Sequence, residues 1–126
     1  MSTNCYCDYD PPVFCRAAIR TARKQYACDE CNGIILAGEK YEYTSGKWDV
    51  GIDVFRTCIH CRNIRVWTKN NIPCLCWAHG HMIEDCQEAV EEACYRASDE
   101  TAGLMFGFLR LVVIRDRLNR DRRKNA

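Results

Sequence analysis

The sequence lacks the features of a membrane or secreted protein. No apolar run approaches the ~20 residues that a helical membrane span requires. The opening Met1-Ser2-Thr3-Asn4-Cys5 has neither the basic nor the apolar region of a signal peptide. We therefore expect no membrane partner and a cytoplasmic location, where cellular reductants keep cysteines as thiols.

Enzyme motifs are missing as well. The chain has no glycine-rich phosphate loop and no His-Glu-x-x-His helix. The segment Pro73-Cys74-Leu75-Cys76 has the wrong spacing for the Pro-Cys-x-x-Cys element of zinc deaminases, and it has no upstream His-x-Glu partner. These absences predict a protein that works by binding rather than by catalysis.

Charge of one sign is not in excess. The 18 Lys and Arg residues nearly balance the 17 Asp and Glu residues, giving a formal net charge of +1. Nucleic-acid-binding domains of this size usually carry a strong positive excess, so the balance favours a protein partner over a nucleic acid. The charge is nevertheless segregated, because residues 82–100 carry seven acidic side chains against one basic one and residues 101–126 carry seven basic against two acidic.

Cysteine, in contrast, is abundant, with 11 in 126 residues. Such a density also occurs in secreted disulfide scaffolds. Here the cysteines cluster in Cys-x-Cys and Cys-x-x-Cys pairs, which favours metal ligands in a reducing compartment. The pairs Cys28/Cys31 and Cys58/Cys61 are separated by 26 residues, enough for a β-hairpin to bring them together. They predict a closed, structural site of four thiolates around one Zn²⁺.

The segments around these pairs have recognisable local patterns. After Cys31 comes Asn-Gly, in which Gly33 is expected to supply the positive φ of a zinc knuckle. Strands are expected at residues 40–44 and 53–57, and a helix from the second pair to about residue 71. Knuckle, β-hairpin and helix follow the order of a treble-clef zinc finger, so we predict an α+β, treble-clef-like module. The basic segment 13–26 is expected to be a solvated connection, with nucleic-acid contact as the alternative.

A second metal site is predicted from two Cys-x-Cys pairs. In an extended chain, cysteines at i and i+2 point to the same side, so each pair can approach one ion. The ligands would be Cys5, Cys7, Cys74 and Cys76, with His79 or His81 as substitutes. Free buried cysteines and ordinary surface histidines are the alternative. The sequence thus predicts one zinc ion and permits two.

The last third of the chain has a helical period. Met82, Cys86 and Val90 form an apolar stripe, and turn residues at 98–101 separate it from a second helix. We therefore divide the chain into a zinc-binding module at 1–81, including the N-terminal tail, and a helical hairpin at 82–126. Cys94 and Cys15 are expected in the core. The second helix is apolar almost all round at its centre, so its remaining face is expected to pack on the module or on a second copy, forming a homodimer.

Three sets of side chains are candidates for function. Trp48 and Phe106 are candidate protein contacts. For an alternative treble-clef nuclease, His79, His81 and Glu84 would hold the catalytic water and a second metal. The candidate nucleic-acid contacts are basic residues on the finger helix and at the C-terminus, namely Arg62, Arg65, Lys69, Arg120, Arg122, Arg123 and Lys124.

Several motifs together resemble a known group of proteins. Residues 4–9 read Asn-Cys-Tyr-Cys-Asp-Tyr, residues 46–49 read Gly-Lys-Trp-Asp, and residues 74–80 read Cys-Leu-Cys-Trp-Ala-His-Gly. With the two Cys-x-x-Cys pairs, they resemble the small cysteine-rich proteins of tailed bacteriophages and prophages, over roughly residues 4–110. The resemblance implies a non-enzymatic accessory protein in the cytoplasm of a bacterial host. We expect such a protein to bind a host or phage protein, with nucleic-acid binding as the alternative.

Overall fold

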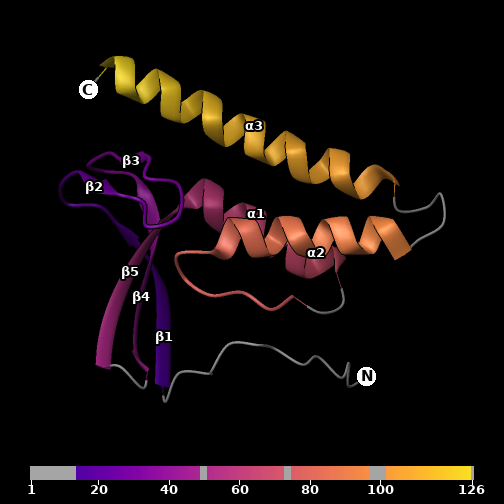
Figure 1. Ribbon diagram of the computed structural model, residues 1–126. Helices are drawn as coiled ribbons and strands as arrows, with labels where there is room; N and C mark the ends of the chain where they lie inside the picture. The colour runs from indigo at the N-terminus through magenta and orange to yellow at the C-terminus, as the bar shows by residue number, and fades with distance from the viewer. Residues whose placement is uncertain (1–13, 49–50, 73–74, 97–101, 126) are drawn as a thin grey trace.

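The computed structural model describes residues 14–48, 51–72, 75–96 and 102–125, without the side chains of residues 96, 102 and 125. The fold is α+β, with a three-stranded antiparallel sheet, a two-stranded ribbon and three helices (Figure 1). The helices gather to one side of the strands, and the ribbon lies at one end of the larger sheet. The predicted fold class is confirmed at this level.

The larger sheet contains β1 (Phe14–Thr21), β4 (Lys40–Trp48) and β5 (Gly51–Cys58), in the order β1-β4-β5. The expected connection at 13–26 is therefore wrong, because most of it is β1. All eight residues of β1 are exposed, Cys15 among them, so the strand has no buried alternating side chains that would reveal it. Its stability comes from eight residues of antiparallel pairing with β4.

The β4–β5 hairpin is longer than predicted, and its two faces differ. Side chains alternate across a strand, so Glu42, Thr44 and Trp48 of β4 share the face that packs against α1 and residues 77–79. Tyr43 and Lys47 lie on the opposite face, which we call the open face. The ribbon, β2 (Tyr26–Ala27) and β3 (Ile34–Ile35), covers one end of that face, where Tyr26 contacts Tyr41 with ring centroids 5.6 Å apart.

The helices build the main core. They are α1 (Ile59–Asn71), α2 (Met82–Arg96) and α3 (Ala102–Asn125). The predicted helix after the second cysteine pair is confirmed, as is the buried stripe Met82, Cys86 and Val90 of α2. Phe108 of α3 joins this core, and Cys94 lies half-buried beside it.

The last helix packs on both α1 and α2, rather than on α2 alone. The approach to α1 is close at Gly107, where an added Cβ would lie 2.5 Å from the ring of Trp67. The outer side of α3 stays uncovered and includes Phe106, which is 77% exposed. Among the described residues, no helix combines the length and the apolar character needed to cross a membrane.

Candidate metal centre

Four cysteines from three elements converge as predicted. Cys28 and Cys31 lie in the turn of the ribbon, Cys58 ends β5, and Cys61 lies in the first turn of α1. Their sulfurs all lie within 4.8 Å of one another, and the Sγ atoms of Cys31 and Cys58 are 3.8 Å apart. Sulfurs at ~2.3 Å from a tetrahedral zinc ion are about 3.8 Å apart, so the cluster has the size that zinc requires.

Backbone N–H groups point at the sulfurs. The Sγ atom of Cys28 accepts from the N–H of Cys58 at 3.2 Å and of Glu30 at 3.4 Å. The Sγ of Cys58, which caps the N-terminus of α1, accepts from the N–H of Cys61 at 3.4 Å. These donors and the positive end of the α1 dipole favour the thiolate form of the cysteines.

The knuckle turn differs from the prediction at one residue. The positive φ, +58°, belongs to Asn32 and not to Gly33. Asparagine tolerates this conformation better than other residues with a side chain do. Gly33 has a different reason to be glycine, because a Cβ there would lie 2.3 Å from the Oδ1 of Asn119.

Helix α3 closes the centre from the far end of the chain. The amide of Asn119 donates from its Nδ2 to the Sγ of Cys31 at 3.4 Å, and a guanidinium nitrogen of Arg115 lies 3.8 Å from the Sγ of Cys61. Asn119 is 7% exposed. The prediction missed both residues, although they continue the buried stripe of α3 beyond Phe108. Polar side chains on a buried stripe must have polar partners.

A second contact anchors the end of α3 to the knuckle ribbon. Arg122 donates to the carbonyl oxygen of Ile34 at 3.1 Å and forms an ion pair with Glu39. A phosphate bound at Arg122, as predicted, would have to compete with Ile34 and Glu39 for its guanidinium group. Lys69, Arg120, Arg123 and Lys124 are exposed, and for them nucleic-acid contact stays a prediction.

Arg65 and Arg62 of α1 also have partners within the fold. The two terminal nitrogens of Arg65 donate to the two carboxylate oxygens of Glu42, each at 2.6 Å, and its guanidinium lies 4.9 Å from the ring centre of Trp77. Arg62 lies 3.5 Å from the same carboxylate. Burial alone would raise the pKa of Glu42, but the bonds from Arg65 outweigh it and hold the pKa below its ordinary value.

The cluster without an ion shares protons among its sulfurs. Hydrogen bonds from the thiols of Cys28 and Cys58 lower the pKa of Cys31. Hydrogen bonds to the sulfurs of Cys28 and Cys31 raise the pKa of Cys61, because a thiol that donates to a neighbouring thiolate holds its proton. A bound cation replaces those protons, so acid weakens metal binding.

Most of the predicted second site lies outside the described residues, which do not include Cys5, Cys7 or Cys74. Of its four predicted cysteine ligands the structure describes Cys76, which is half-buried. The second zinc site stays a prediction.

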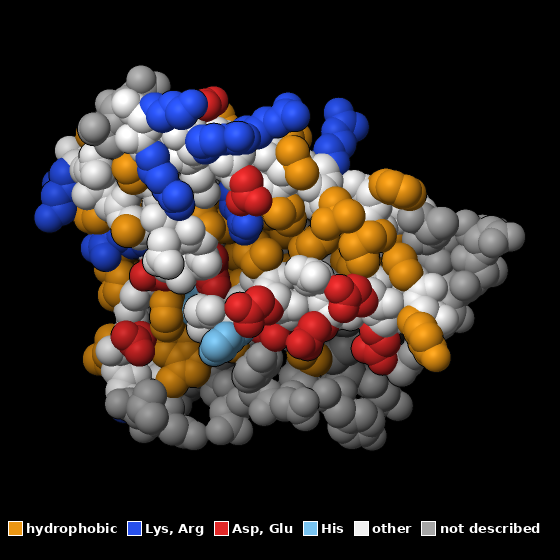
Figure 2. Space-filling model, turned by 45° about the horizontal axis from the view of Figure 1, so that its top comes forward, with side chains coloured by type: hydrophobic (Ala, Val, Ile, Leu, Met, Phe, Trp, Pro, Cys, Tyr) orange, Lys and Arg blue, Asp and Glu red, His pale blue; other side chains and the backbone are white. Residues whose placement is uncertain are grey.

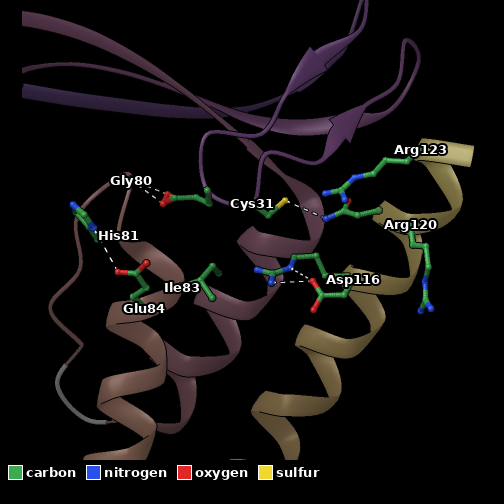
Figure 3. A pocket seen from close by; sticks show the side chains of 11 residues that line it. Cys31, Gly80, His81, Ile83, Glu84, Asp116, Arg120 and Arg123 are labelled. Atoms are coloured by element: carbon green, nitrogen blue, oxygen red, sulfur yellow. Dashed lines mark hydrogen bonds and ion pairs between the residues drawn. The ribbon is translucent and has the colours of Figure 1, made fainter. Parts of the chain in front are cut away.

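The two histidines that follow have different surroundings. The ring of His79 stacks on Phe55 with centroids 4.3 Å apart, and burial lowers its pKa to about 4. His81 is exposed, with its Nδ1 3.6 Å from the carboxylate of Glu84 (Figure 3). A neutral His79 packed among aromatic rings is poorly placed to hold a metal with His81, as the nuclease alternative requires.

A cleft of about 370 Å³ lies beside the metal centre (Figure 3). Its walls come from the knuckle, the start of α2 and the basic half of α3. The carboxylate of Glu30 accepts from the N–H of Gly80 at 2.8 Å and of Met82 at 3.1 Å, and thereby ties the knuckle to the start of α2. Through the knuckle, the cysteine cluster therefore connects to the start of α2 as well as to α3.

Comparison with family models, curated proteins and solved structures finds no match for the chain.

Proposed function

We propose that this is a non-enzymatic binding protein in which one Zn²⁺ on Cys28, Cys31, Cys58 and Cys61 holds a treble-clef-like module together. A catalytic zinc keeps a position open for water or substrate, whereas four cysteines fill a tetrahedral shell. Cys28 and Cys61 are fully buried, and α3 covers the outer side of the cluster. This closed donor set supports a structural role.

The observation that carries the binding function is an apolar surface on α3, which we call the α3 patch. It consists of Phe106, Leu109, Val113 and Ile114, which are 77%, 44%, 47% and 41% exposed. Successive members of this set are three, four and one positions apart in the sequence, so all four lie on one side of the helix. Contiguous apolar side chains in such a position mark interaction sites.

We propose a second copy of the chain as the partner at this patch. In Figure 2, hydrophobic side chains gather between basic groups toward the top and a row of acidic groups below them. In a two-fold symmetric pair, each copy presents the same surface. Rotation about an axis through the patch would place the acidic row of one copy opposite the basic groups of the other.

Sedimentation equilibrium of the zinc-loaded protein tests this proposal. We expect a dimer at micromolar concentration that weakens as salt is raised, because the flanking charges are exposed. Val113→Asp should give a monomer, whereas Ile52→Asp, at a 74% exposed position on β5, should leave the dimer unchanged.

A monomer at all concentrations would overturn the self-association. If that monomer captured a host or phage protein and Val113→Asp abolished the capture, the patch would instead be the surface through which a phage or prophage accessory protein binds its partner. The two results therefore separate the two kinds of protein partner.

A further inference from the structure

The open face of the three-stranded sheet collects side chains that the sequence keeps apart. The pairing of β1 with β4 sets Ala18 opposite Tyr43, and the pairing of β4 with β5 sets Tyr43 opposite Arg56. By alternation, Arg16 and Arg20 of β1 lie on the same face as Tyr43. The basic segment before the first cysteine pair thus has aromatic neighbours, although none is interleaved with it in sequence.

All the charged side chains at the open-face positions of the three strands are basic. Arg16, Arg20 and Lys47 are exposed, and Arg56 is half-buried. The other open-face positions of the three strands are apolar or neutral, and no Asp or Glu occupies one of them. The small net charge of the whole chain therefore conceals a surface of one sign, because acidic residues concentrate on α2.

The basic groups lie against aromatic rings. The guanidinium carbon of Arg20 is 3.8 Å from the ring centre of Tyr43, and that of Arg56 is 4.5 Å from the ring centre of Tyr26. Guanidinium planes and aromatic rings are the surfaces on which unpaired bases stack, while arginine and lysine also contact phosphates. Both kinds of contact are therefore available at the same place.

The other end of the open face offers a second place for stacking. Phe14 and Ile52 flank Lys47 in register and are 55% and 74% exposed. Large apolar side chains beside a lysine are unfavourable in water but suit the ring of a base and its phosphate. From Phe14 to Arg20 the strand advances about 20 Å, at ~3.3 Å per residue, enough for a short run of nucleotides.

We propose that the open face binds single-stranded nucleic acid, with bases stacked on Phe14 and on the Tyr43–Arg20 pair and with phosphates at Arg16, Lys47 and Arg56. A duplex hides its base faces, and proteins read it by placing a helix or a two-stranded ribbon in a groove. The face of a three-stranded sheet is too broad for that. An acidic peptide could satisfy the charges but would leave the exposed ring of Phe14 and the half-buried ring of Tyr43 unused.

Fluorescence anisotropy of the zinc-loaded full chain with labelled 12-nucleotide RNA and DNA strands tests the proposal. The expected result is single-strand binding with a slope of log K against log salt of about −2, for three phosphates at ~0.7 each. Phe14→Ala should weaken binding about 5- to 150-fold, the range for loss of one stacked base. The oligonucleotide that binds more tightly, RNA or DNA, identifies which nucleic acid the open face recognises.

A matched pair of double variants locates the site. Arg16→Ala with Arg20→Ala should weaken binding at least 10-fold, whereas Lys69→Ala with Arg120→Ala removes the same charge from exposed positions on the helices and should leave binding within twofold. Zinc content and the unfolding midpoint confirm that both variants are folded.

Three outcomes would overturn the proposal. They are equal losses in both double variants, absence of single-strand binding at low salt, and competition by polyglutamate as strong as by an unlabelled oligonucleotide. The last would show a surface that recognises acidic peptides through charge alone. None of these outcomes bears on the dimer, which is measured by sedimentation.

Discussion

Gly33 and Asn119 share a space that holds only one side chain. The Cβ of an alanine at 33 would lie 2.3 Å from the Oδ1 of Asn119, closer than two such atoms can approach. Either the knuckle or the end of α3 must then shift, and the amide of Asn119 leaves the sulfur of Cys31. Glycine is therefore needed at position 33 because of a contact between residues far apart in sequence. Rules for local turns could not predict this requirement.

We predict that Gly33→Ala lowers the free energy of unfolding by about 1–3 kcal/mol, as overpacking does. Because the clash is with one side chain, Gly33→Ala combined with Asn119→Ala should cost less than the sum of the single changes. Asn119→Ala alone should weaken zinc binding about 10-fold in a chelator competition, the effect of losing a partner of a metal ligand.

Chemical denaturation of the four proteins measures these effects. Gly103→Ala is the control, because nothing lies within 4 Å of its added Cβ. Strictly additive losses would contradict the shared space.

Glu42 and Arg65 form a second pair on which the fold depends. Their side chains are 6% and 13% exposed, so removing one charge leaves the other buried without its main partner. We predict that Glu42→Gln destabilises the protein by roughly 3 kcal/mol at neutral pH. The sequence did not predict this pair, since Arg65 was assigned to a surface that contacts phosphate.

The pH dependence of this loss has a definite sign. The pKa of Glu42 is lowered in the folded state, so its stabilisation is complete above its ordinary value of 4.5 and is lost as the pH falls through the folded value. The difference between wild type and Glu42→Gln should therefore be constant from pH 7 to about 5 and shrink at lower pH. Thermal unfolding of both proteins, with enough zinc in the buffer to keep the cluster occupied at each pH, measures the difference, and one that grew in acid would contradict the pairing.

At the scale of elements, the sequence predicts best what depends on short spacings. Cysteine pairs with two residues between them and a helix that begins at the second pair depend on local geometry, and both are found. β1 was not predicted because all eight of its residues are exposed, so it lacks the alternation of buried and exposed side chains that marks a strand, and its sequence also fits a solvated loop. The sequence predicts that the last helix packs on the zinc-binding module or on a second copy, but not which of its residues contact the knuckle, because these contacts depend on packing between segments 88 residues apart.

The end of α3 should protect the metal. Removing residues 115–126 eliminates Arg115, Asn119 and Arg122, and with them the contacts to two sulfurs and to the ribbon. We predict that the shortened protein keeps its core at Phe108 but releases zinc to a chromogenic chelator at least 10-fold faster. Replacing the exposed Arg120 and Arg123 by Ala in the full chain should leave the rate unchanged. Equal rates in the full and shortened chains would exclude the protective role.

At the scale of the whole molecule, folding and metal binding should be one reaction. The cluster joins the ribbon, β5 and α1, and α3 and Glu30 connect to it. We predict that Cys58→Ala, or a chelator under reducing conditions, abolishes cooperative unfolding, because structural zinc supplies on the order of 10 kcal/mol. Since thiols must lose protons to bind the ion, the loss of metal should begin in mild acid.

Circular dichroism and elemental analysis check this prediction. Cys15→Ala, at an exposed thiol, is the control and should behave as wild type. A Cys58→Ala protein that still unfolded cooperatively would refute the organising role of zinc. The same analysis counts the ions: two per chain, falling to one in Cys74→Ala, would establish the predicted second site, and one in both would remove it.

The contact between Asn119 and Cys31 also has a consequence for the order of events during synthesis. All four cysteines that would bind zinc precede residue 62, but the groups that cover them lie at 115 and 119. A growing chain can therefore acquire its ion well before it can shield it. Until residues 115 and 119 have been synthesised and have folded onto the cluster, the thiolates are open to exchange and oxidation, and the cell has its best opportunity to load, replace or withhold the metal.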